Sequence, residues 1–137
     1  MNPKQVAEYM FGQDYFSQWM NIKMIDIREH YCLIEMPIKK EMINGLKTVH
    51  GGVTFAFADS ALAFSSNNSG DAAVALNCII NFTKAGKEGD VFRAESMLVN
   101  NTRKTAIYDI KITNQNEELI AKFIGTVYKI GKKVTEL

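Results

Sequence analysis

Residues 50–68, HGGVTFAFADSALAFSSNN, decide how the rest of this 137-residue chain folds. The pattern predicts a helix whose apolar side chains point in every direction, which is typical of a buried helix. The segment is too short to span a bilayer, which needs about 20 apolar residues. Asp59 is its only charged residue. Because a lone carboxylate in apolar surroundings is costly unless paired or needed, we interpret Asp59 as functional rather than as a capping or solvated aspartate.

The sequence around this segment predicts short helices before it and strands on both sides of it. Pro3 and Gly12 suit the first turn and the end of a helix over residues 3–11. An antiparallel sheet packed on one helix is an α+β layer architecture. The other expected elements are a helical turn at 14–20, a hairpin within 22–36 with His30 as a solvated turn residue, strands at about 73–83, 89–99, 104–114 and 118–130, and a frayed polar tail after Ile130.

Composition excludes several classes of protein. The length suits one domain covering residues 1–137. A formal net charge of +1 gives no strong attraction to nucleic acid or to an anionic membrane. Cys32 and Cys78 lack metal-ligand spacing and are interpreted as buried thiols, so no metal and no cofactor is expected. The N-terminus lacks the features of a signal peptide, and the predicted location is the cytoplasm.

The residues at the head of the predicted helix suggest where chemistry takes place. The first N–H groups of a helix have no partner within the helix and carry its positive dipole end. Gly51 and Gly52 would let a substrate oxygen approach the backbone closely, which favours an oxyanion site. The chain has neither a phosphate-binding loop nor a convincing Ser/His/Asp arrangement. We therefore expect a mechanism that uses one carboxylate and backbone donors.

The spacing of the helix predicts that two chains cooperate. His50 and Asp59 are nine residues apart, which along one helix is about 13 Å and about 2.5 turns, so that they lie on opposite faces. They cannot act on the same atom within one chain. If they cooperate, two copies of the chain must meet.

Two stretches resemble a known family, the PaaI-type hotdog thioesterases. The first is Asn44-Gly45-Leu46-Lys47-Thr48-Val49-His50-Gly51-Gly52 followed by Ala58-Asp59, and the second is Ile80-Asn81-Phe82 with the turn at residues 84–90. The resemblance covers residues 15–130. It implies a hotdog fold, in which a curved antiparallel sheet wraps around one long central helix. With the elements expected from the sequence, this gives a sheet of about six strands and a short N-terminal helix. It also implies a homodimer that assembles into a homotetramer.

The same resemblance implies hydrolysis of an acyl-CoA thioester. Asp59 would be the nucleophile or the general base, and the Gly51 N–H would polarise the thioester carbonyl. Asn44 would orient the thioester or the attacking water, and His50 would support the loop and the substrate. Asn44, His50 and Gly51 would come from one subunit and Asp59 from the other.

Further residues are expected to bind substrate, and some depart from the family pattern. Ala75 stands at or near a position where relatives carry Ser or Thr, so either Asn77 or Ser60 would hold the water or hydrolysis would be slow. The expected substrate contacts are Gly52, Asn77 and, for the phosphates of coenzyme A, Lys84, Lys87, Arg103 and Lys104, while Phe55, Leu62, Phe64 and Trp19 are candidates for the acyl pocket. The alternatives are a hotdog hydratase or dehydratase, a non-catalytic acyl-CoA-binding module, and an inactive partner subunit.

Overall fold

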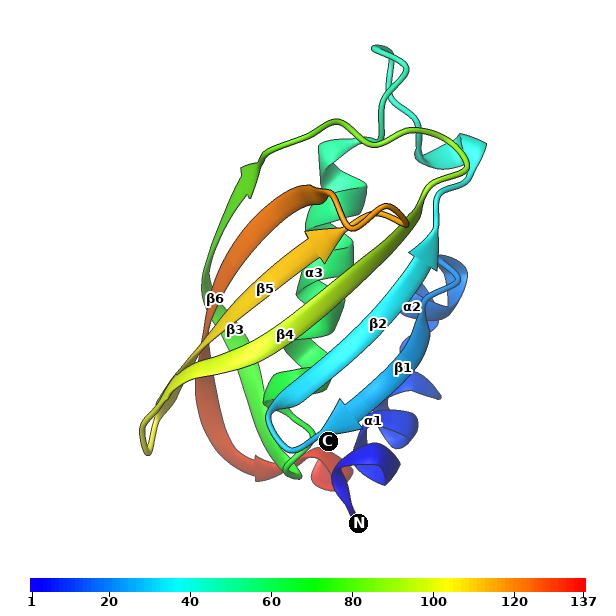
Figure 1. Ribbon diagram of the computed structural model, residues 1–137. Coiled ribbons are helices and arrows are strands. Elements are labelled where there is room, and N and C mark those ends of the chain that lie inside the picture. The colour runs from blue at the N-terminus through cyan, green and yellow to red at the C-terminus, as the bar shows by residue number, and fades with distance from the viewer.

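In the computed structural model, which describes residues 1–137, one six-stranded antiparallel sheet curves around the long helix α3 (Gly51–Ser66) (Figure 1). The strands lie in the order β1-β2-β4-β5-β6-β3. This is the predicted α+β hotdog arrangement. The other elements are α1 (Pro3–Phe11), α2 (Tyr15–Trp19), β1 (Lys23–Arg28), β2 (Tyr31–Pro37), the 3₁₀ helix η1 (Lys40–Met42), β3 (Asp71–Phe82), β4 (Val91–Asn101), β5 (Thr105–Thr113), β6 (Leu119–Lys133) and the 3₁₀ helix η2 (Val134–Glu136).

The N-terminal helices begin where local capping chemistry favours a helix start. The Asn2 side chain accepts from the Gln5 N–H at 2.8 Å, and the Gln5 side chain accepts from the Asn2 N–H in return. Pro3 occupies the first turn, as predicted. Asp14 caps α2 by accepting from the Ser17 N–H at 2.9 Å. These caps satisfy N–H groups that a short helix leaves without partners.

The core lies between α3 and the inner face of the sheet. Leu62 and Phe64, two of the expected acyl-pocket residues, are fully buried in it, so that assignment was wrong for both. Phe55 packs edge-on against Phe123 with ring centroids 5.2 Å apart, which makes it a packing residue as well. Trp19 alone among the four is exposed, at 75% of its surface.

The expectation that α3 is buried on all sides holds for only part of the helix within one chain. The face toward the sheet is covered, with Phe57 and Ala61 completely buried. On the opposite face Gly52 and Asp59 are exposed, and Ala63 is half-buried. One curved sheet reaches around only part of a helix, and the residues on the open face have no cover from their own chain.

β3 forms one edge of the sheet, because it pairs only with β6. It is 12 residues long, and several of its apolar side chains reach solvent. A long apolar edge strand readily pairs with another strand. The exposed apolar residues are Val74 (52%), Leu76 (63%), Ile79 (56%) and Phe82 (56%).

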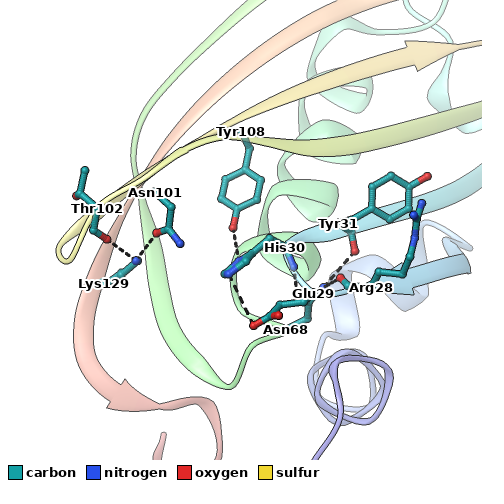
Figure 2. Close-up of polar contacts among 9 residues, drawn as sticks. All are labelled: Arg28, Glu29, His30, Tyr31, Asn68, Asn101, Thr102, Tyr108 and Lys129. Atoms are coloured by element: carbon teal, nitrogen blue, oxygen red, sulfur yellow. Dashed lines mark hydrogen bonds and ion pairs between the residues drawn. The ribbon is translucent and has the colours of Figure 1, made fainter.

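The turn between β1 and β2 is held in place by partly buried polar contacts (Figure 2). The His30 N–H donates to Asn68 Oδ1 at 2.9 Å, and the Asn68 amide donates to the carbonyl oxygens of Arg28 and Tyr31. His30 Nδ1 lies 3.0 Å from the hydroxyl of the buried Tyr108. The interpretation of His30 as a solvated turn residue was therefore wrong. Asn68 follows α3, so this contact fixes the end of the central helix to the hairpin.

The C-terminal tail is ordered, which contradicts the predicted fraying. β6 continues to Lys133, and its end pairs with Asp71 at the start of β3. Val134 is buried against Val6 and Ala72. The polar composition suggested a frayed tail, but one apolar side chain that packs into a small second core is enough to hold the tail in place.

Gly86, in the turn after β3, lies where a side chain does not fit. A Cβ there would come within 2.4 Å of Phe92 and 2.9 Å of Val49, and Phe92 is fully buried. Since overpacking a core typically costs about 1–3 kcal/mol, Gly86→Ala is expected to lower the free energy of unfolding by that amount. Gly45→Ala, with nothing within 4 Å of the new methyl group, is the control and is expected to be close to neutral. Urea denaturation measures both, and equal stabilities for the two variants would contradict this packing.

Candidate active site at the head of the central helix

The head of α3 presents one backbone N–H group without a partner. His50 caps the helix: its Nδ1 accepts from the Gly52 N–H at 2.9 Å. The N–H groups of Val53 and Thr54 donate to the His50 carbonyl oxygen at 2.9 and 3.3 Å. The Gly51 N–H has no acceptor within the chain. This leaves a free donor at the positive end of the helix dipole, which is the arrangement required of an oxyanion site.

The cap also fixes the tautomer of His50. Because Nδ1 accepts a hydrogen bond, the proton of the neutral ring is on Nε2. Nε2 is thus a donor that makes no hydrogen bond within the chain. His50 thus caps the helix with one nitrogen, and its other nitrogen is a donor without a partner in the chain.

The loop before the helix is closed by Asn44. Its Oδ1 accepts from the N–H groups of Leu46 and Thr48 at 2.9 and 3.2 Å and from the Thr48 hydroxyl at 3.3 Å. Its backbone N–H donates to the Thr48 carbonyl oxygen at 2.8 Å. The side-chain oxygen is therefore committed to the loop, and only the amide NH₂ is free to contact a substrate or a water.

Two cavities flank the helix head. One, of about 640 Å³, lies beside α2 and is mostly apolar, with His50 and Gly52 at its wall together with Trp19 and Met42. The other, of about 340 Å³, includes Gly51 and Lys84. A larger hollow of about 840 Å³ lies elsewhere, on the polar outer face of β2, β4 and β5, and contains none of the predicted site residues.

Phe82 and Lys84 lie on the β3 side of the helix head. A Cβ placed on Gly51 would lie 3.2 Å from the Phe82 ring, so the glycine is what allows this close approach. Lys84 Nζ is paired with Glu118 at 3.0 Å. Because Phe82 packs against Gly51, the end of β3 is adjacent to the free Gly51 N–H.

Asp59 lies on the open face of α3, and its environment disfavours the charged form. Although its side chain reaches solvent, desolvation by surrounding protein raises the pKa of Asp59, and the negative charge of Asp14 raises it further. The pKa of the Cys78 thiol is also raised, first by burial and then by the charge of Asp59. Asp14 and Cys78 are thus neighbours of Asp59 that sequence reasoning missed. The capping pattern at Asp14 and Ser17 was a readable signal for α2, but only the fold brings that turn to Asp59.

Asp59 and the helix head are well separated along one chain. Gly51 and Asp59 belong to one uninterrupted helix, so eight residues separate them by about 12 Å of rise. The prediction that His50 and Asp59 lie on opposite faces of one helix needs correction, because His50 is only the N-cap and the helix begins at Gly51. Gly52 and Asp59, seven residues apart, are both exposed on the same face. Between Gly51 and Asp59, eight residues add about 80° of rotation around the axis to this axial distance.

The remaining predicted residues are scattered around the molecule. Ser60 is buried and lies 2.9 Å from the Ser17 hydroxyl, so it does not face a water site. Asn77 pairs with Thr126 at a β-bulge, while its neighbour Cys78 pairs with Gly125, which faces Leu62 of α3. Since side chains alternate along a strand, Asn77 faces away from the helix of its own chain.

The predicted phosphate-binding cations are at two opposite ends of the sheet. Lys84 is at the helix head, whereas Arg103 and Lys104 are in the β4–β5 hairpin at the opposite end of the sheet (Figure 1). There they line a cavity of about 570 Å³, together with Lys129, Lys132 and Lys133. The Lys129 ammonium bonds to Asn101 and Thr102 and ties the hairpin to β6 (Figure 2).

Nowhere in the chain do three or more His, Cys, Asp or Glu side chains gather in a way that would hold a metal ion. None of the helices combines the length and the apolar character that a membrane span requires.

Comparison with known proteins shows the family of the chain. The profile of the thioesterase superfamily matches residues 46–121. The acyl-coenzyme A thioesterase PaaI of Escherichia coli is 34% identical over 131 residues, which are 96% of this chain and 94% of that protein. The chain belongs to the thioesterase superfamily. A putative esterase of Archaeoglobus fulgidus is 36% identical to this thioesterase over 129 residues, covering 94% of the chain and 84% of the relative.

Solved structures place the thioesterase in the PaaI-type branch that its motifs resemble. The structure of the E. coli PaaI protein from the phenylacetic acid degradation operon matches with a TM-score of 0.94, covering 96% of this chain and 95% of that chain. A hypothetical thioesterase of Streptococcus pneumoniae, solved with coenzyme A, matches with a TM-score of 0.79 at 27% identity, covering 82% and 88%.

Proposed function

We propose that this thioesterase hydrolyses an acyl-CoA thioester to a free acid and coenzyme A. The observation that carries the proposal is the unpartnered Gly51 N–H at the positive end of α3. A donor in this position stabilises the negative charge that develops on a thioester oxygen during attack. The relatives support the choice of substrate, since one is named an acyl-coenzyme A thioesterase and another is solved with coenzyme A.

In the proposed reaction each polar group has one task. The Gly51 N–H donates to the thioester carbonyl oxygen, and the free NH₂ of Asn44 and Nε2–H of His50 hold the substrate near it. Asp59 either attacks the carbonyl carbon, which breaks the C–S bond, expels the coenzyme A thiolate and leaves an acyl anhydride that water then hydrolyses, or it takes a proton from a water that attacks the carbonyl and expels the thiolate. In both cases Asp59 must be ionised, so its raised pKa sets the acidic limit of activity.

We further propose that two chains pair through β3 and complete each other's sites. The free, apolar edge of β3 is suited to antiparallel pairing with its own copy, which produces a two-fold dimer. Such pairing runs the two α3 helices in opposite directions past each other. The helix head of one chain is thereby brought toward the open face of its partner's helix, where Asp59 lies. Assembly of such dimers into a tetramer is part of the same proposal.

The phosphates of coenzyme A are assigned to the cationic cavity at the β4–β5 hairpin. Arg103, Lys104 and Lys132 form no ion pair within the chain, which leaves their charge for a ligand. By contrast, the ammonium group of Lys84 already forms an ion pair with Glu118. In an antiparallel dimer the hairpin end of one chain lies toward the helix head of its partner.

A panel of short-chain, long-chain and aryl acyl-CoA substrates, assayed by release of free thiol, tests the proposed function. We expect hydrolysis of at least one substrate class, and the same rate after exhaustive treatment with EDTA, because no group of metal ligands is present. Binding of acyl-CoA without thiol release would favour the non-catalytic module. Activity that is lost to EDTA and restored only by a metal ion would contradict the mechanism.

A further inference from the structure

The turn between α1 and α2 is attached to α3 by a chain of hydroxyl hydrogen bonds next to Asp59. Asp14 Oδ2 accepts from the Ser17 hydroxyl at 2.6 Å, and its Oδ1 accepts from the Ser17 N–H. The Ser17 hydroxyl in turn lies 2.9 Å from the hydroxyl of Ser60. Ser17 is completely buried and Ser60 is 7% exposed. Buried hydroxyl groups are costly without partners, so these contacts specify how α2 sits on α3.

The residue to which this chain of contacts leads is the one that follows Asp59. We propose that Asp14 is a positioning residue of the active site, which through Ser17 and Ser60 holds α2 against the turn of α3 that carries Asp59 and places a second carboxylate near it. The inference rests on the proposed role of Asp59 and extends it to a residue in a different element.

The electrostatic consequence follows from like charges. Two neighbouring carboxylates disfavour each other's ionised forms, so Asp14 makes Asp59 hold its proton more strongly. Desolvation by burial raises the pKa of Asp59, and the charge of Asp14 raises it further. The other titratable group near Asp59 is Cys78 of β3, while α3 itself has no other ionisable side chain. Cys32 and Tyr108 lie on the side of α3 that faces the sheet.

Asp14→Asn tests this inference, because it keeps a capping oxygen and the shape of the side chain but removes the charge. We expect the pKa of Asp59 to fall toward its ordinary value, so that the ionised form persists to lower pH. The acidic limb of the kcat–pH profile then moves to lower pH. Asp26→Asn, an exposed change of the same charge in β1, is the control and is expected to leave the limb in place.

Ser17→Ala separates the charge from the hydroxyl contacts. It removes the link to Ser60 but keeps the carboxylate of Asp14, so we expect a lower kcat with the acidic limb near its wild-type position. The Ser17 N–H still donates to Asp14 Oδ1 in this variant, so the carboxylate stays at the start of α2. A limb moved as far as in Asp14→Asn would then be caused by the lost hydroxyl contacts rather than by the charge, and the inference would fail. Asp14→Ser, which also caps a helix, gives a second uncharged variant in case Asp14→Asn does not fold.

Carbon-13 NMR titration of the Asp59 carboxyl group decides the point without any substrate. The signal is assigned by its loss in Asp59→Asn. A lower titration midpoint in Asp14→Asn, together with a shifted limb, supports the inference, and an unchanged midpoint or an unmoved limb overturns it. An enzyme that hydrolyses no acyl-CoA would refute the proposed function instead, and the titration would still test the effect of Asp14 on Asp59 separately.

Discussion

Asp59→Asn is expected to lower kcat for the best acyl-CoA substrate by about 10²-fold or more, the scale on which acid–base groups contribute. The amide keeps the shape and the hydrogen-bonding ability of the side chain but can neither attack the carbonyl nor accept a proton from water. Substrate binding involves other groups, so KM should change little. Steady-state kinetics over the acyl-CoA panel measure both constants.

The same variant is expected to be more stable than the wild type at neutral pH. The pKa of Asp59 is raised in the folded state, so folding favours the protonated form. Such a group has no cost below its unfolded-state pKa of about 3.9, and it destabilises the fold as the pH rises through the folded-state pKa. The gain in Tm of Asp59→Asn should therefore be present at pH 7 and vanish in acid.

Asp26→Asn serves again as the control and should change neither kcat nor the pH dependence of Tm. Wild-type turnover by Asp59→Asn would remove Asp59 from the mechanism. A variant that loses both activity and stability at neutral pH would instead show that Asp59 supports the fold.

Co-refolding two inactive variants, Asp59→Ala and Asn44→Ala, is expected to restore about a quarter of wild-type activity. Gly51 and Asp59 are about 12 Å apart along one helix, whereas a reacting carbonyl must lie within about 3 Å of both the oxyanion donor and the attacking group. One chain cannot meet both requirements, but a two-fold pair can meet them twice. Random pairing gives about half mixed dimers, each with one intact site and one doubly damaged site.

The matched control is a mixture of Asn44→Ala with His50→Ala. Both residues belong to the same half of the proposed site, so every site in a mixed dimer keeps one defect and no activity should return. Native mass spectrometry establishes that mixed dimers have formed. Recovery no greater than the sum of the parents in the first mixture would place the whole site within one chain.

Local patterns in the sequence were sufficient for the elements of the fold. The helix over residues 3–11 is confirmed at both ends, because Pro3 and Gly12 act on their own neighbours in the chain. The four later strands lie within three residues of their predicted ends, since the alternation of apolar side chains depends on which face meets the core. The helix start at His50 was equally readable, because capping is a contact between residues two or three positions apart.

Contacts between distant residues decided the rest. Nothing near His30 in the sequence indicates that Asn68 and Tyr108 will bond to it, 38 and 78 positions away. Polar composition suggested that the tail frays, but Val134 meets Val6 at the other end of the chain.

The sequence by itself predicted which groups form the candidate site: a lone carboxylate in an apolar helix, and glycines at the head of that helix. It did not determine the surroundings of these groups. The tertiary structure decided that α3 keeps an open face, that Asp14 lies near Asp59, and that Lys84 and Arg103 are at opposite ends of the sheet. Spacing along a helix follows from fixed local geometry, whereas electrostatic neighbours and exposed faces depend on how the sheet curves and where it ends.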